Sequence, residues 1–125
     1  MQPHFTGTCL ITDDVPALAA FYAALLDADV EGGDPFARVA VPGAVLSFFS
    51  AQGMESMVPG SASAGAHGGF TLEFRVTDVD ARHEQLLSQG VPVLKPPTTQ
   101  AWGRRSVWLR DPDGNIVNLY QDARP

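Results

Sequence analysis

The sequence predicts an α+β fold in which the order strand, helix, several strands occurs twice along 125 residues. One observation is a repeat: Asp78-Val79-x-Ala81 follows Asp14-Val15-x-Ala17 at a spacing of 64 residues, and Leu86 takes the place of Tyr22. The other is the Gly-, Ser- and Ala-rich segment at residues 51–69, which divides the chain near its middle and has the composition of a flexible connector. Internal repetition of this kind indicates two similar modules before any single motif is considered.

In the first half, residues 8–11 have the composition of a strand. A helix is expected to begin at residues 13–16, with Asp14 as a cap and Pro16 at an early helical position. Its apolar residues have the i, i+3, i+4 spacing of a helix with one buried face: Val15, Leu18, Tyr22, Leu25 and Leu26. Two strands are expected at 36–41 and 44–49 around a Pro42-Gly43 turn. Residues 1–50 therefore form the first predicted module.

In the second half, residues 70–76 alternate apolar and polar side chains over the length of a strand. A helix is expected to open at residues 77–81 and to end near Gly90. Further strands are expected at 91–94, 106–109 and 116–120, and the Asp-Pro-Asp-Gly-Asn sequence at 111–115 predicts a tight hairpin between the last two. Residues 70–125 form the second predicted module of what is one domain overall.

Composition excludes several classes of function. Eight Lys and Arg against fourteen Asp and Glu give a net charge of −6, which disfavours binding of nucleic acid or anionic lipid. No apolar run approaches the ~20 residues that span a bilayer, and we see no signal peptide at the N-terminus. The single cysteine, Cys9, excludes an intramolecular disulfide, so we expect a cytoplasmic protein. The excess of acid lies in residues 1–60, which indicates either a solvated acidic surface or an attraction for a cationic small molecule.

Residues 102–119, from Trp102-Gly103-Arg104 to Asn118-Leu119, resemble the closing segment of the vicinal oxygen chelate superfamily of glyoxalases, extradiol dioxygenases and bleomycin-resistance proteins. Residues 14–22 and 74–80 are similar to the two strand-to-helix entries of that superfamily. The resemblance covers about the whole chain. It implies two βαβββ modules whose curled mixed sheets surround a cleft.

The resemblance also implies where a metal ion would bind. Members that use a metal hold it with His, Glu or Gln, two from each module. By the family pattern these positions are Gly7 and Thr71, each seven residues before its helix-entry Asp, together with Ser47 and Asn118. Glycine has no side-chain donor, and neutral hydroxyls or an amide cannot replace imidazole and carboxylate for a catalytic divalent ion. We therefore expect no metal and no other cofactor.

Strand alternation predicts the side chains that would line the cleft. The candidate ligand-binding residues are Ser47, Phe49, Thr71, Glu73, Arg75, Trp102, Arg104, Trp108, Asn118 and Tyr120. Trp102 would either stack on a planar ligand, aided by Arg104 or Arg105, or plug a loop, and Trp108 would face either the core or the cleft. No residue is expected to be catalytic, and Cys9 is expected to be a small apolar filler.

The metal-free members that this chain resembles bind antibiotics without converting them. That resemblance predicts a small-molecule binding protein that sequesters an aromatic or cationic antibiotic or natural product in the cleft of a homodimer. Two alternatives remain open. The first is a glyoxalase- or dioxygenase-like metalloenzyme whose ligands are displaced by a register slip. The second is a metal-free enzyme that uses Glu73, Cys9 or Tyr120 as acid or base in the same cleft.

Overall fold

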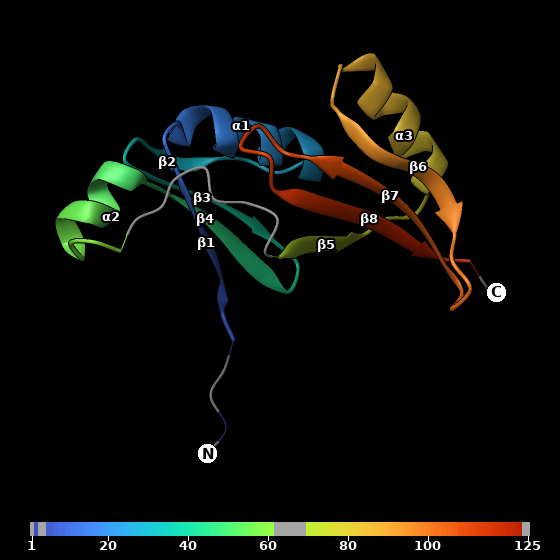
Figure 1. The fold of residues 1–125 in the computed structure, drawn as a ribbon, viewed down its shortest axis with the longest axis horizontal. Coiled ribbons are helices and arrows are strands. Elements are labelled where there is room, and N and C mark those ends of the chain that lie inside the picture. The colour runs from blue at the N-terminus through green and yellow to red at the C-terminus, as the bar shows by residue number, and fades with distance from the viewer. Residues whose placement is uncertain (1, 3–4, 62–69, 124–125) are drawn as a thin grey trace. The chain divides into compact units, whose positions relative to one another are not determined.

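The computed structural model describes residues 2, 5–61 and 70–123. The chain forms two compact units, Met1–Ala66 and His67–Pro125, and each is described by itself (Figure 1). The boundary between them falls within residues 62–69, so the second part of the expected connector lies outside the described residues.

The first unit is a four-stranded mixed sheet with a long helix on one face. Its elements are β1 (Gly7–Thr12), α1 (Val15–Leu26), β2 (Glu31–Gly33), β3 (Phe36–Val41), β4 (Ala44–Ser50) and α2 (Ala51–Met57). The strand order is β1-β4-β3-β2, with β1 parallel to β4 and the other neighbours antiparallel. Helix α1 packs on β3 and β4.

The second unit repeats this topology. Its elements are β5 (Thr71–Arg75), α3 (Val79–Ser88), β6 (Val93–Thr99), β7 (Arg104–Arg110) and β8 (Ile116–Asp122). The strand order is β5-β8-β7-β6, and β5 is parallel to β8. Because the order and the direction of pairing match the first unit, the repeat in the sequence corresponds to two βαβββ units, and the predicted α+β class is confirmed.

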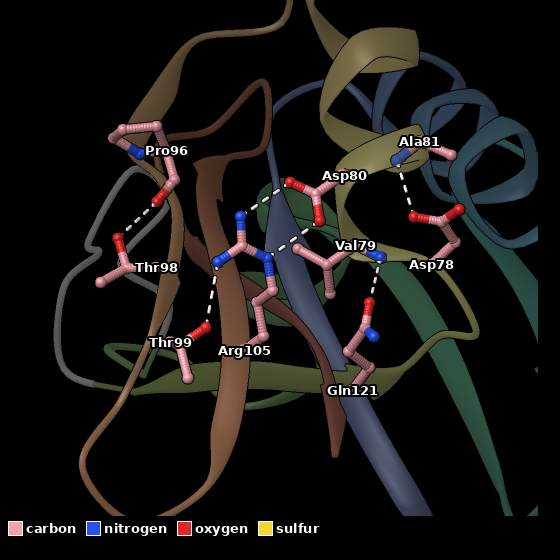
Figure 2. A network of polar contacts seen from close by, with 9 residues as sticks. All are labelled: Asp78, Val79, Asp80, Ala81, Pro96, Thr98, Thr99, Arg105 and Gln121. Carbon is pink, nitrogen blue, oxygen red and sulfur yellow. Dashed lines mark hydrogen bonds and ion pairs between the residues drawn. The ribbon is translucent and has the colours of Figure 1, made fainter. Parts of the chain in front are cut away.

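Both long helices begin as the sequence predicts. The side chain of Asp14 accepts a hydrogen bond from the amide of Ala17 at 3.1 Å, and that of Asp78 accepts one from the amide of Ala81 at 3.0 Å (Figure 2). Tyr22 and Leu86, which hold equivalent positions in the repeat, are both buried. In the first unit, the ring of Tyr22 stacks on that of Phe48 with centroids 5.6 Å apart.

Three elements differ from the sequence prediction. Residues 51–57, expected to be flexible, form α2, because the hydroxyl of Ser50 caps its first turn by accepting from the amide of Gly53 at 2.9 Å. The short β2 lies in residues 27–34, for which the sequence predicts no strand. Strand β6 continues through Pro96 and Pro97, because it is an edge strand with register shifts, where a missing backbone donor is tolerated.

Candidate functional site

Each sheet has one face that packs on its long helix and one that points away from it, which we call the distal face. Side chains alternate between the two faces along every strand. In the second unit Val107, Leu109, Val117 and Leu119 are buried on the side of α3. The residues between them therefore lie on the distal face.

The second distal face brings together seven of the ten sequence-predicted residues. Thr71, Glu73 and Arg75 of β5 lie beside Ile116, Asn118 and Tyr120 of β8, and Trp108 of β7 lies opposite Asn118. Arg104 lies on the same face at the start of β7, as do Ser106 and, across from Trp108, Lys95 of β6. Trp108 thus faces away from α3. Of the two orientations that the sequence allowed, toward the core or away from it, the structure has the second.

Asn118 and Ser106 are the buried polar residues of this face among the described strand positions. Only 3% of the surface of Asn118 is exposed, and its Nδ2 donates a hydrogen bond to Glu73 Oε2 at 3.2 Å. Its Oδ1 is buried and accepts no hydrogen bond from any described residue. Buried acceptors are rarely left unsatisfied, because desolvation without a partner costs about 1–3 kcal/mol. The amide oxygen is therefore a buried acceptor that has no donor among the described residues.

An arginine lies on the tyrosine of this face. Arg104 Cζ is 3.9 Å from the centroid of the Tyr120 ring, a cation–π contact. The neighbouring Arg105 lies on the opposite side of the sheet, where its Nε and Nη2 donate to the carboxylate of Asp80 at 2.9 and 2.8 Å and its Nη1 donates to Thr99 at 3.0 Å (Figure 2). Of the two arginines that the sequence suggested as ligand contacts, only Arg104 lies on the distal face.

Arg105 instead holds the start of α3 to the sheet. Its hydrogen bond to Asp80 lowers the pKa of that carboxyl and raises the pKa of the guanidinium. Gln121 adds to this attachment, since its Oε1 accepts from the amide of Val79 at 2.6 Å (Figure 2).

The first distal face contains Ser47 and Phe49, the other two strand residues predicted to bind ligand. Ser47 lines a hollow of about 320 Å³ together with Thr6, Gly7, Thr8, Cys9, Arg38 and Val45. Arg38 forms an ion pair with Glu31 at 3.2 Å. It was not among the predicted ligand residues, although alternation along residues 36–41 places it on this face. Phe49 meets Phe36 edge-to-face with centroids 6.1 Å apart, and Gly53 of α2 lies directly over its ring. Phe49 is therefore a packing residue of the first unit.

Cys9 is exposed, so the expectation of a buried filler is wrong. It lies on the distal face because it pairs with Ser47 while its neighbours Leu10 and Thr12 are turned toward the core. Partial burial of the thiol raises its pKa. A thiol that remains protonated at neutral pH is a poor nucleophile.

Trp102 lies outside both sheets, in the loop between β6 and β7, and 70% of its surface is exposed. The loop is closed by the hydrogen bond from the amide of Gly103 to the carbonyl of Gln100 at 3.0 Å. Trp102 therefore does not plug the loop, and it is not among the residues of the distal face.

The four positions at which the family holds a metal do not fit one here. Gly7 has no donor, and the backbone leaves no room for one, because a Cβ at this position would collide with the carbonyl oxygen of Val45. Ser47, Thr71 and Asn118 offer only neutral oxygens, which are weak ligands for catalytic transition metals. Among the described residues, no group of three His, Cys, Asp or Glu side chains is arranged to hold a metal ion.

Three acidic residues of the first half have local structural contacts. Asp14 caps α1, Glu31 pairs with Arg38, and Glu55 Oε1 accepts from the amide of Gly60 at 2.8 Å. Within the described parts of the chain, no helix is both long and apolar enough to be a candidate membrane span.

Comparison with known proteins places this geometry in a family. The model of the Glyoxalase/Bleomycin resistance protein/Dioxygenase superfamily matches residues 2–119. The chain is similar to the uncharacterized protein YraH of Bacillus subtilis, with 38% identity over 53 residues, a match that spans only 42% of this chain and 41% of that relative.

Solved structures share the fold. A glyoxalase-related enzyme from Fulvimarina pelagi superposes with a TM-score of 0.81 at 23% identity, over 97% of this chain and 89% of that one. A lactoylglutathione lyase from Agrobacterium tumefaciens superposes with a TM-score of 0.74 at 23% identity, over 96% of this chain and 94% of that one. At this identity the likeness shows the fold alone, whereas the family model covers nearly the whole sequence. The chain therefore belongs to the glyoxalase/bleomycin resistance protein/dioxygenase superfamily.

Proposed function

We propose that this protein binds a planar aromatic small molecule on the distal face of its second unit, without a metal ion and without converting it. The observation that carries the proposal is the buried Asn118 Oδ1, which has no described donor. Asn118 pairs with Trp108 across β7 and β8, and Tyr120 follows two residues later on the same face of β8. Small-molecule sites combine apolar and aromatic walls with a few polar groups that fix orientation. A ring that contacts Trp108 and donates an N–H or O–H to Asn118 would satisfy both features.

The biological purpose we propose is sequestration of an aromatic antibiotic or natural product. The family description includes bleomycin resistance proteins beside enzymes, which supports binding as one use of this fold. As part of the same proposal, the protein acts as a cytoplasmic homodimer. Sedimentation equilibrium tests the dimer, and a monomer at all concentrations used for ligand binding would exclude it.

The test is a ¹H–¹⁵N NMR titration that follows the two indole N–H signals. A Trp102→Phe variant assigns the remaining signal to Trp108. We expect planar aromatic compounds that carry a hydrogen-bond donor to shift the Trp108 signal to saturation in the presence of EDTA. Asn118→Leu should weaken that binding about tenfold, because a hydrogen bond to a buried acceptor is lost, whereas Arg105→Gln on the opposite face should not. Absence of a saturable shift across a broad aromatic panel would overturn the proposal.

The alternatives from the enzyme class are tested on the same sample. Mass spectrometry of the ligand after denaturation should recover it unchanged; a new mass would support a metal-free enzyme. The metalloenzyme requires a divalent ion, for which the residues at the family's metal positions are unsuitable. About one equivalent of Ni, Zn, Fe or Mn in protein purified without chelator would favour it.

A further inference from the structure

We infer that the aromatic ligand is an anion whose acidic group lies at Arg75 and Arg104, on either side of Tyr120. This inference rests on the proposed function and specifies the chemical class of its ligand. It differs from the cationic ligand that the acidic excess of residues 1–60 suggests.

The charged side chains of the second distal face are mainly cationic. Its cations are Arg75, Lys95, Arg104 and Arg110, and its acids are Glu73 and Asp122. Glu73 accepts the hydrogen bond from Asn118, and Arg110 Nη1 donates to the carbonyl of Gly114 at 2.7 Å. Asp122 is exposed at the end of β8, opposite Arg104, without an ion pair to it. The remaining cations are thus available to an outside anion.

The two arginines beside Tyr120 lack carboxylate partners within the described residues. Arg104 is held over the ring of Tyr120, and Arg75 is the neighbour of Tyr120 on the β5 side. Arg105, the neighbour of Arg104 in the sequence, differs from both because it makes a bidentate contact with the carboxylate of Asp80. A planar guanidinium that is already ordered loses little further freedom when it binds a carboxylate, and Arg–carboxylate contacts are strong and directional.

The spacing along β8 suits one aromatic acid. Tyr120 and Asn118 are two residues apart on the same face, about 7 Å at the rise of a strand. A ring system of that length reaches from the arginines beside Tyr120 to Trp108 and Asn118. The acidic group would therefore contact Arg75 and Arg104, and the ring would contact Trp108 and Asn118.

The experiment compares three ligands that share a naphthalene ring with a 6-hydroxyl donor for Asn118 and differ in the charge of the substituent at position 2: 6-hydroxy-2-naphthoate, 6-hydroxy-2-naphthamide and 6-hydroxy-2-naphthylmethylammonium. Their affinities are measured from the Trp108 indole signal at constant ionic strength. We expect the naphthoate to bind about tenfold more tightly than the amide and the ammonium compound to bind most weakly. Arg75→Gln and Arg104→Gln should each remove most of the preference for the acid. Arg105→Gln, which removes the same charge from the next residue but on the opposite face, should leave the preference intact.

The possible outcomes separate the two claims. If the amide binds and the acid binds no more tightly, the ligand is not an anion, although the proposed aromatic site stands. If the ammonium compound binds most tightly, the inference is overturned in favour of a cationic ligand. If Arg105→Gln reduces the preference as much as Arg104→Gln does, the effect comes from net charge and the assigned arginines are wrong. If none of the three shifts Trp108, the proposed function itself fails.

Discussion

The two units share their strand order and pairing but differ in the residues at equivalent positions of the distal face. Cys9 pairs with Ser47 in the first unit where Glu73 pairs with Asn118 in the second. The first face presents Arg38 and small neutral side chains around a hollow. The second presents an amide, two aromatic rings and two arginines that have no carboxylate partner among the described residues. Because the backbone topology is the same, the chemical difference between the two faces comes from a few side chains on the distal face of each sheet.

The largest expected difference between the units is steric. Gly7→His should destabilise the protein by about 2 kcal/mol, because its Cβ would collide with the carbonyl oxygen of Val45 and the strands would have to separate. Thr71→His, at the equivalent and exposed position of β5, should change the free energy of unfolding by less than about 0.5 kcal/mol. Urea unfolding measures both. Equal effects would mean that β1 and β4 have room for a side chain at this position.

The second difference concerns the buried amide. Asn118→Leu should stabilise the unliganded protein by about 1 kcal/mol, since it removes an acceptor that has no described partner and leaves the exposed Glu73 free to be hydrated. Ser47→Ala, the equivalent position in the first unit, should be neutral within about 0.5 kcal/mol. Thermal and urea unfolding provide the measurement. Strong destabilisation by Asn118→Leu would show that the amide is already satisfied in the protein.

The third difference is at the start of the long helices, where Asp80 in α3 corresponds to Pro16 in α1. The hydrogen bond from Arg105 lowers the pKa of Asp80 below its ordinary value of 3.8. A carboxyl with a lowered pKa in the folded state stabilises it above the unfolded pKa, and that contribution disappears as the pH falls through the folded pKa. The stability difference between the wild type and Arg105→Gln should therefore be small and salt-dependent at pH 7, and it should decrease in acid to what the hydrogen bond to Thr99 contributes. A difference that does not decrease as the pH falls below both pKa values would contradict this assignment.

The smallest effect concerns Cys9, for which the second unit has Glu73. Since partial burial raises the pKa of the thiol, iodoacetamide should alkylate Cys9 a few-fold more slowly at pH 7.5 than it alkylates an unstructured peptide thiol. A Cys9→Ser variant confirms the site of reaction. If Cys9 were alkylated faster than the peptide thiol, it would be an activated thiol, and this result would favour the alternative of a metal-free enzyme.

The sequence predicts the repeat, the caps of both long helices and the strands of the second distal face, because periodicity and capping are local signals. The resemblance to the family also places Gly7 and Thr71 on first strands, seven residues before each helix-entry Asp, and Ser47 and Asn118 on last strands. The sequence does not predict α2, whose cap is a single hydroxyl at Ser50, or the continuation of β6 through Pro96, which depends on its position at the edge of the sheet.

Side-chain partners were not predictable from the sequence. Alternation alone places Arg104 and Arg105 on opposite faces. Only the tertiary structure shows that Arg105 forms an ion pair with Asp80 and that Arg104 makes a cation–π contact with Tyr120. The acidic character of the first half was also ambiguous. Asp14, Glu31 and Glu55 have local partners, and only the pairing of strands shows that cations outnumber acids on the distal face of the second unit.

The most direct measurement is the NMR titration of the Trp108 indole signal with 6-hydroxy-2-naphthoate in EDTA, repeated after addition of excess Ni²⁺ or Zn²⁺. The account predicts saturable binding in EDTA with the same affinity after the metal is added, and loss of that binding in Asn118→Leu. Binding or turnover that appears only with the metal would contradict it.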